Sequence, residues 1–332
     1  MLDTLQLQDV IVSSMATNVC PGRACFALSG GVDSTLLTAI AAKTNQFDDV
    51  IAYTAVTGSG SDLPYAVRAA DALGIELRRV KVPTGLDALD FYDEMSGRAG
   101  APLSLVGNSI GFAAVCAAAK ADGFDTIVDG TGAEQVTAGN HRIIVDWLAL
   151  AEVAGCDNLV ETFVQRNGEQ FLKQARRQGM RFATMADAIE QDLTASRFTY
   201  WRDHHTVTQR AVGIKIVSPF LAPECDVLKH QPLEWYCPDG WLKSPLRKLL
   251  ALHTNESIAY RKDNQGLRWP IKSNLTGCRR RMRQTIAATG VLRELSLQHW
   301  LEFKVGITST GRLTRLYKEA TAHRLKGLTL SK

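Results

Sequence analysis

The sequence predicts an α/β protein built on a doubly wound parallel sheet. Along the first 140 residues, short apolar segments alternate with segments of helical length, and glycine-rich turns separate them. Strands that alternate with helices are typical of parallel sheets with helical crossovers. In such sheets ligands bind at the carboxyl ends of the strands, so we expect a site at the turns that follow them.

The first half of the chain follows this alternation closely. Apolar residues at helical spacing predict a packing helix in residues 1–20. The predicted strands are residues 24–28, 50–56, 77–82 and 126–128, and the predicted helices between them are residues 34–43, 62–73 and 109–122. Ser61 and Asp62 are expected to cap the helix 62–73, and Gly74 is expected to end it. The polar stretch 83–101 is predicted to be an irregular loop with a short helix that covers the site.

Beyond residue 140 helical periodicity dominates and strand signals become sparse. The predicted helices are residues 143–153, 159–165, 168–177, 184–193 and 241–253. We therefore divide the chain into an N-terminal packing helix (1–22), an α/β core (23–140) and a mainly helical region for substrate binding and catalysis (141–332).

Composition excludes several classes of protein. Of the 332 residues 45% are hydrophobic and 22% are charged, as in ordinary soluble globular proteins, and a net charge of +4 argues against a nucleic-acid partner. The seven cysteines form no C-x-x-C pair, which argues against a zinc site and a disulfide framework. No apolar run is long enough for a membrane span, and the first residues lack the basic segment of a signal peptide. A cytoplasmic location is expected.

A phosphate-binding turn is predicted where the first strand meets its helix, in the sequence Ser-Gly-Gly-Val-Asp-Ser at residues 29–34. Gly30 and Gly31 let a phosphate approach the backbone N–H groups and the positive end of the helix. Ser29 and Ser34 add hydroxyl donors, and Asp33 adds a carboxylate that can hold Mg²⁺ against the phosphates. The simpler alternative is a tight turn without a ligand. No G-x-x-x-x-G-K-[ST] motif of the kinase-type phosphate loop occurs in the chain.

This turn resembles the pyrophosphate loop of the N-type ATP pyrophosphatases, which cleave ATP between the α and β phosphates. The resemblance implies AMP and pyrophosphate as products, an adenylated intermediate, and a core of the adenine nucleotide α-hydrolase-like kind.

A second glycine-rich turn, Asp-Gly-Thr-Gly-Ala-Glu-Gln at residues 129–135, follows the predicted strand 126–128. Gln135 stands where the dinucleotide fingerprint needs a third glycine, so that interpretation is rejected. Four stretches in order are instead similar to the synthetase domain of asparagine synthetases and β-lactam synthetases. They are residues 28–34, 61–66 and 128–134, and a fourth set at 219–221, 242–247 and 261–270. The resemblance spans roughly residues 23–275.

The resemblance implies ATP and Mg²⁺ as cofactors and assigns site residues. The implied ATP-binding residues are Leu28, Ser29, Gly30, Gly31, Asp33, Ser34, Val56, Asp129 and Gly130. Asp33 and Glu134 would hold Mg²⁺, and Lys243 would stabilise charge on the phosphates and on the tetrahedral intermediate. Arg247 lies one helical turn further and would share the face of Lys243. The alternative roles are helix capping for Asp33 and solvated surface positions for Glu134, Lys243 and Arg247.

The chain departs from the family where substrate is bound. Thr131 stands at the family's glutamate, which is tyrosine in β-lactam synthetases, and Glu134 replaces the family's aspartate. Asn140 ends the stretch that corresponds to the family's Gly-Gly-Tyr, and with His141 and Thr131 it is a candidate for substrate contact. The family's glutaminase domain, with its N-terminal cysteine, is not expected here.

A general base must take a proton from the attacking amine, and threonine cannot serve. Histidine titrates near neutrality, so His141, His204 and His205 are candidates. The cluster that contains Trp201, Arg202 and the last two of these histidines is expected to line the substrate site rather than bind a metal.

The expected function is an ATP-dependent amide-forming ligase. It would adenylate a small-molecule carboxylate and transfer the acyl group to ammonia or an amine, with a separate glutaminase or biosynthetic partner as one source of nitrogen. A homo-oligomer is left open. Two alternatives are a pyrophosphate-loop enzyme of tRNA modification or sulfur transfer, and a non-catalytic ATP-binding protein with a decayed site.

Overall fold

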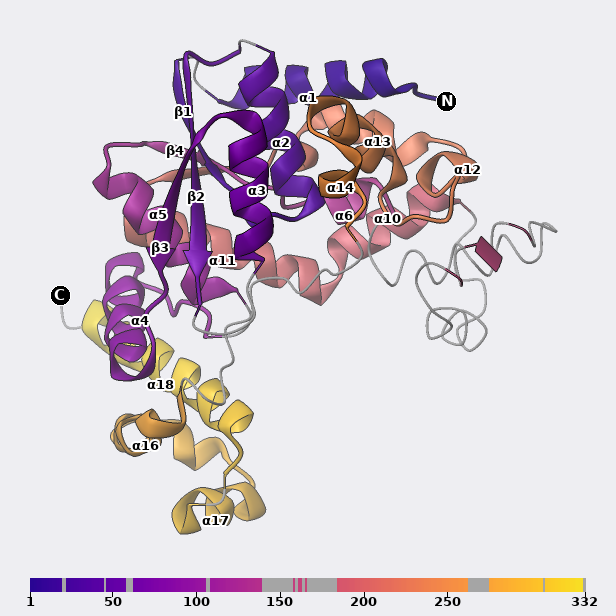
Figure 1. Cartoon of the computed structure of the whole chain (residues 1–332). Helices are drawn as coiled ribbons and strands as arrows, with labels where there is room; N and C mark the ends of the chain where they lie inside the picture. Colours follow the sequence, from indigo (N-terminus) through magenta and orange to yellow (C-terminus); the bar gives the residue numbers. More distant parts are fainter. Residues whose placement is uncertain are drawn as a thin grey trace.

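Figure 1 shows the computed structural model of the whole chain. The structure describes residues 1–19, 22–44, 46–57, 62–105, 108–138, 158, 161–162, 165, 184–261, 275–306 and 308–330. The predicted helices 143–153 and 168–177 lie outside these ranges, as do Asn140 and His141. Of the predicted helix 159–165, residues 161, 162 and 165 are described, and all three are helical.

Five parallel strands form one sheet in the order β3-β2-β1-β4-β5. They are β1 (Arg23–Ala27), β2 (Asp49–Val56), β3 (Glu76–Lys81), β4 (Thr126–Val128) and β5 (Lys215–Val217). The chain moves outward from β1 through β2 to β3 and then returns, so that β4 pairs with the other edge of β1. Cys25 of β1 is therefore opposite Ile51 of β2 on one side and Ile127 of β4 on the other. The crevice for a ligand is therefore expected between the carboxyl ends of β1 and β4. The predicted α/β fold is confirmed.

The two faces of the sheet bury alternate residues of each strand, as the pleat requires. Phe26 and Val128 pack with α1 (Thr4–Asn18), α2 (Val32–Lys43) and α13 (Ser244–His253) in one core. On the other face Cys25 and Ile127 pack against α5 (Ser109–Ala121) in a separate core. These helices cover both faces, so the sheet is buried and its strand ends are held rigidly.

Several helices start and end near the predicted bounds, among them the predicted helices 62–73, 109–122 and 184–193. Helix α3 (Leu63–Leu73) ends at Gly74, whose φ of 67° is left-handed, as predicted. Asp62 is the residue before α3, but its carboxylate pairs with Arg261 at 3.1 Å and makes no capping bond. Further along, the elements are α6 (Ala133–Val136), α10 (Met185–Thr194), α11 (Ser196–Val212), η1 (Pro219–Leu221), η2 (Pro223–His230), α12 (Leu233–Tyr236) and α14 (Glu256–Ala259), and then η3 (Thr276–Cys278), α16 (Arg279–Ala287), η4 (Gly290–Glu294), α17 (Leu297–Val305) and α18 (Thr310–Leu330).

The prediction of an irregular loop at residues 83–101 is wrong. The segment forms a 15-residue helix, α4 (Gly85–Ala99), and no residue of it lines a cavity at the carboxyl ends of the strands. Leu89, Tyr92 and Met95 lie at helical spacing and pack with Tyr317 and other residues of the C-terminal helices in a core of their own. Figure 1 shows α4 next to α18 (Thr310–Leu330). The many charged residues between these apolar positions hid the spacing.

Strand β5 was not predicted. It contains three residues in a half of the chain where helical periodicity dominates, so its strand signal did not stand out. It pairs with β4 from Thr126 opposite Lys215 to Val128 opposite Val217. The sheet is thus completed by a segment from beyond residue 140, while the domain division at that residue stays a prediction. Among the described residues no helix has the length and apolar character needed to cross a membrane.

Helix α1 is tied to the segment after β5 by one buried hydrogen bond, from Ser14 Oγ to the carbonyl of Pro219 at 2.7 Å. The Ser14→Ala substitution removes this buried hydrogen bond, while the Pro219 carbonyl keeps the bond that it accepts from Ala222 N at 3.1 Å. We therefore expect the free energy of unfolding to fall by about 0.5–1.5 kcal/mol. Ser13→Ala is the matched control, because Ser13 is exposed on the same helix. Urea unfolding of both variants measures the difference, and an equal stability of the two would contradict this role.

Candidate active site

Two glycine-rich loops meet at the carboxyl ends of β1 and β4. A Cβ on Gly130 would lie 2.9 Å from Asp33 Cβ and 2.9 Å from Ser34 N, so only glycine permits the approach. In the first loop Gly30 has a φ of 77°, and a Cβ there would lie 2.6 Å from Ala66 N. The two turns singled out in the sequence are therefore in direct contact.

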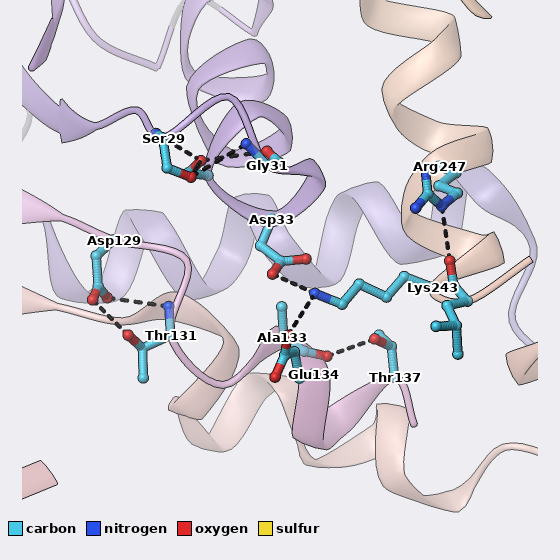
Figure 2. A network of polar contacts seen from close by, with 12 residues as sticks. Ser29, Gly31, Asp33, Asp129, Thr131, Ala133, Glu134, Thr137, Lys243 and Arg247 are labelled. Atoms are coloured by element: carbon cyan, nitrogen blue, oxygen red, sulfur yellow. Dashed lines mark hydrogen bonds and ion pairs between the residues drawn. The ribbon is translucent and has the colours of Figure 1, made fainter. Parts of the chain in front are cut away.

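The hydroxyls of the first loop hold its shape. Ser29 Oγ and Ser34 Oγ are 3.0 Å apart, Ser29 N donates to Ser34 Oγ at 3.1 Å, and Gly31 N donates to Ser29 Oγ at 3.2 Å (Figure 2). Helix α2 starts directly afterwards with Gly31 as its N-cap residue, so Asp33 lies within the helix and the alternative that it caps the helix is wrong. The loop offers hydroxyls, amides and a helix N-terminus to an anion.

Lys243 joins the two loops to the C-terminal half of the chain. Its Nζ lies 2.6 Å from Asp33 Oδ2 and 3.4 Å from Glu134 Oε1, and Figure 2 shows the side chain extended between the two carboxylates. The Lys243 side chain is 12% exposed. Its backbone is left-handed, with φ 58° and ψ 33°, directly before α13. The left-handed backbone conformation costs a non-glycine residue about 1–2 kcal/mol. It indicates that contacts with the surrounding residues fix the position of Lys243.

The ionisation of these groups follows from their burial and their neighbours. Burial raises the pKa of the Asp33 carboxyl, and the Lys243 ammonium opposes that rise. For Lys243, burial alone would lower the pKa, but Asp33 and Glu134 outweigh it and hold the pKa above its usual range. The ammonium is therefore charged at neutral pH. Asp33 Oδ1 is buried without a hydrogen-bond partner in the described part of the chain.

Arg247 contacts backbone rather than the two carboxylates. Its Nε donates to the carbonyl of Leu242 at 2.8 Å, its Nη1 donates to the carbonyl of Ala259 at 2.5 Å, and burial lowers its pKa. The guanidinium also lies 5.3 Å from the centre of the Trp241 ring. Arg247 thus holds the turn that carries Lys243, and its predicted catalytic role stays a prediction.

A cavity of about 360 Å³ opens between the two loops and the helices α10 and α11. Its lining includes Asp33 and Glu134 from the two loops and an aromatic wall. The wall consists of Phe112 from α5 and of Phe198, Trp201 and His205 from α11, and Asp192 from α10 also lines the cavity. Sequence analysis singled out Trp201 and His205 but missed the other three.

A smaller cavity of about 120 Å³ adjoins the first and shares Ala27 and Phe112 with it. Leu28, Tyr53 and Leu63 contribute to its lining, between the ends of β1 and β2. Of the implied ATP-binding residues, Leu28 lines this cavity, whereas Val56 lines neither of the two.

Asp129 is held at the base of the second loop. It accepts hydrogen bonds from Thr131 Oγ1 at 2.6 Å and from Ser218 Oγ at 2.5 Å, and its Oδ2 lies 3.3 Å from His205 Nε2. Its contacts with these side chains were not predicted, and its implied role in binding ATP stays a prediction. His204, the residue before His205 on α11, is buried, and neither of its ring nitrogens has a hydrogen-bond partner among the described residues.

Asp33 and Glu134 are carboxylates of the two loops that both pair with Lys243 and both line the larger cavity. Among the described residues no cluster of three or more histidine, cysteine or acidic side chains could hold a metal. Two carboxylates nevertheless suit Mg²⁺, which takes one or two of them together with phosphate oxygens and water. The unpartnered, buried Asp33 Oδ1 is an oxygen acceptor of the required kind.

Comparison with known protein families identifies the family of this chain. The family model described as asparagine synthase matches residues 7–327, nearly the whole chain. This confirms the resemblance found in the sequence, agrees with the five-stranded parallel sheet, and implies an ATP-dependent ligase. No curated protein matches the chain.

The buried His204 predicts a pH dependence of stability. Burial lowers its pKa to about 3, so the folded state keeps the ring neutral while the unfolded chain takes up a proton below pH 6.5. The stability from this residue is complete above pH 6.5 and is lost as the pH falls towards 3, by about 2 kcal/mol between pH 6.5 and 5. The free energy of unfolding of wild type and His204→Phe is measured with urea at several pH values in this range. We expect it to fall less steeply with decreasing pH in the variant than in the wild type. An equal dependence on pH in both proteins would contradict a buried neutral His204.

Proposed function

Since the chain belongs to the asparagine synthase family, we propose that it is an AMP-forming carbon–nitrogen ligase. ATP adenylates a substrate carboxylate and pyrophosphate is released. Ammonia or an amine then attacks the acyl-adenylate, which gives an amide and AMP.

The observation that carries this proposal is the meeting of Lys243 with Asp33 and Glu134 beside the first glycine loop. A fixed ammonium placed against a phosphate-binding turn stabilises the charge that grows on the departing pyrophosphate. In that role Lys243 Nζ exchanges its carboxylate partners for phosphate oxygens. Asp33 and Glu134 would then hold Mg²⁺, which supplies further neutralisation of the phosphates.

The two cavities suggest where ATP and the other substrates bind. The smaller one is lined by apolar groups, including Leu28 and Tyr53, and suits the flat adenine base. The phosphates would extend from it across Ser29 and Gly31 to Asp33. The larger cavity, next to the α-phosphate position, has room for the carboxylate and the nucleophile. Catalysis in this arrangement is mainly positioning and electrostatics.

The alternatives receive less support. A sulfur-transfer enzyme needs a reactive thiol, but Cys25, Cys116 and Cys225 are buried, and burial raises the pKa of the last two. None of the described cysteines lines the larger cavity. A decayed site does not account for a buried lysine held in a left-handed conformation between two carboxylates.

Nucleotide product analysis tests the proposal. Purified protein is incubated with Mg-ATP and a pooled set of amino and dicarboxylic acids, with and without ammonium. We expect AMP and pyrophosphate, and a loss of at least about 10²-fold in Lys243→Met and in Asp33→Asn, because removing one electrostatic donor costs about that much.

The matched control is Lys248→Met, since Lys248 is an exposed lysine of the same helix α13 and pairs with Asp239 at 3.9 Å. It should keep wild-type turnover. ADP and phosphate as products, or full activity of Lys243→Met, would contradict the assignment.

A further inference from the structure

The proposed acyl transfer requires a group that removes a proton from the nitrogen nucleophile. Amines are largely protonated near neutral pH, and they attack only through the free lone pair. Thr131, which occupies the position of an ionisable residue in the resembling families, has a hydroxyl that cannot act as a base at this pH. Asp33 and Glu134 are paired with Lys243 on the phosphate side of the cavity.

We propose that His205, held by Asp129, is the general base of the acyl-transfer step, an assignment that rests on the proposed function. His205 lines the same cavity as Asp33 and Glu134; it comes from α11 and reaches the start of the second glycine-rich loop at Asp129. Its neighbour His204 does not line the cavity, because successive residues of a helix point in directions about 100° apart.

Asp129 contacts the imidazole ring of His205. Its Oδ2 lies 3.3 Å from His205 Nε2, and the side chains of the two residues are only 7% and 12% exposed. Ser218 and Thr131 donate to different oxygens of the carboxylate, so it cannot rotate freely. Figure 2 shows Asp129 and Thr131 on the side of the loop away from Lys243. The contact of Asp129 with His205 is thus separate from the ion pairs that Lys243 makes with Asp33 and Glu134.

The imidazole ring is also held by aromatic packing. The Phe112 ring centre lies 5.1 Å from that of His205 with 32° between the planes, and the Trp201 centre lies 6.4 Å away. A carboxylate at Nε2 favours the tautomer with its proton there, which leaves the lone pair on Nδ1. Asp129 then stabilises the imidazolium that forms, as a carboxylate does for the histidine of a catalytic triad.

The step balances without a further reactant. The nitrogen lone pair forms a bond to the acyl carbon, and one N–H proton passes to His205 Nδ1. The bond from the acyl carbon to the adenylate oxygen breaks, and its electron pair leaves with AMP. Asp129 is a positioning residue in this step, since it acts through His205.

Two nucleophiles that differ in their need for a base test this assignment. With an acid that supports ATP–pyrophosphate exchange, amide formation from ammonium is compared with hydroxamate formation from hydroxylamine, which is mostly unprotonated at neutral pH. In His205→Gln we expect the ratio of amide to hydroxamate to fall about 10²-fold or more. Asp129→Asn should shift the ratio in the same direction, because an amide nitrogen cannot accept the Nε2 proton.

His230→Gln is the matched control, since His230 is exposed at the end of η2 and lies outside the cavity. It should leave the ratio unchanged. An equal fall with both nucleophiles in His205→Gln, or no fall, would overturn the assignment while leaving the ligase in place, because exchange is measured separately. If no acid supports exchange in the wild type, the proposed function fails and the assignment fails with it.

Discussion

The ion pairs of Lys243 with Asp33 and Glu134 are the constraint on which the rest of the structure depends. They join residues 210 and 109 positions apart in the sequence. The Lys243–Asp33 pair is the more buried of the two, with side chains 12% and 21% exposed, whereas the Glu134 side chain is 44% exposed. Removing one partner from a buried pair leaves an uncompensated charge, which is strongly destabilising. The ends of β1 and β4 and the start of α13 must therefore meet in one arrangement. We infer that the same groups fix the fold here and bind the phosphates.

The site divides between two structural sources. The sheet and its loops provide the nucleotide side through local turns that only glycine permits, as at Gly130 against Asp33. Helices α10 and α11, with Phe112 from α5, provide other lining residues of the same cavity. Thr131, one of the departures from the family motifs, also lines this cavity. We expect a change of substrate to be accommodated near Thr131 rather than at the phosphate-binding turn.

The parts of the molecule that could be predicted from the sequence are those with local signals. Strand β1 is an apolar run between Gly22 and Gly30, and β4 leads directly into the second glycine-rich turn. The resemblance to the family assigned Asp33, Glu134 and Lys243 to the site, although it gave none of their contacts. Helix α4 was not predicted because charged residues masked its apolar spacing. Strand β5 was not predicted because it is a three-residue strand in a half of the chain where helical periodicity dominates. The pairing of Asp129 with Ser218 and His205 depends on β4, β5 and α11 packing together, and no spacing in the sequence reveals it.

A crystal structure with Mg²⁺ and α,β-methylene-ATP, which cannot be cleaved between its first two phosphates, tests the central claim most directly. The account predicts phosphates over Gly30 and Gly31, a metal ion bound by Asp33 and Glu134, and Lys243 Nζ on a phosphate oxygen. A nucleotide bound elsewhere, or Lys243 still paired with both carboxylates while the nucleotide is bound, would contradict it.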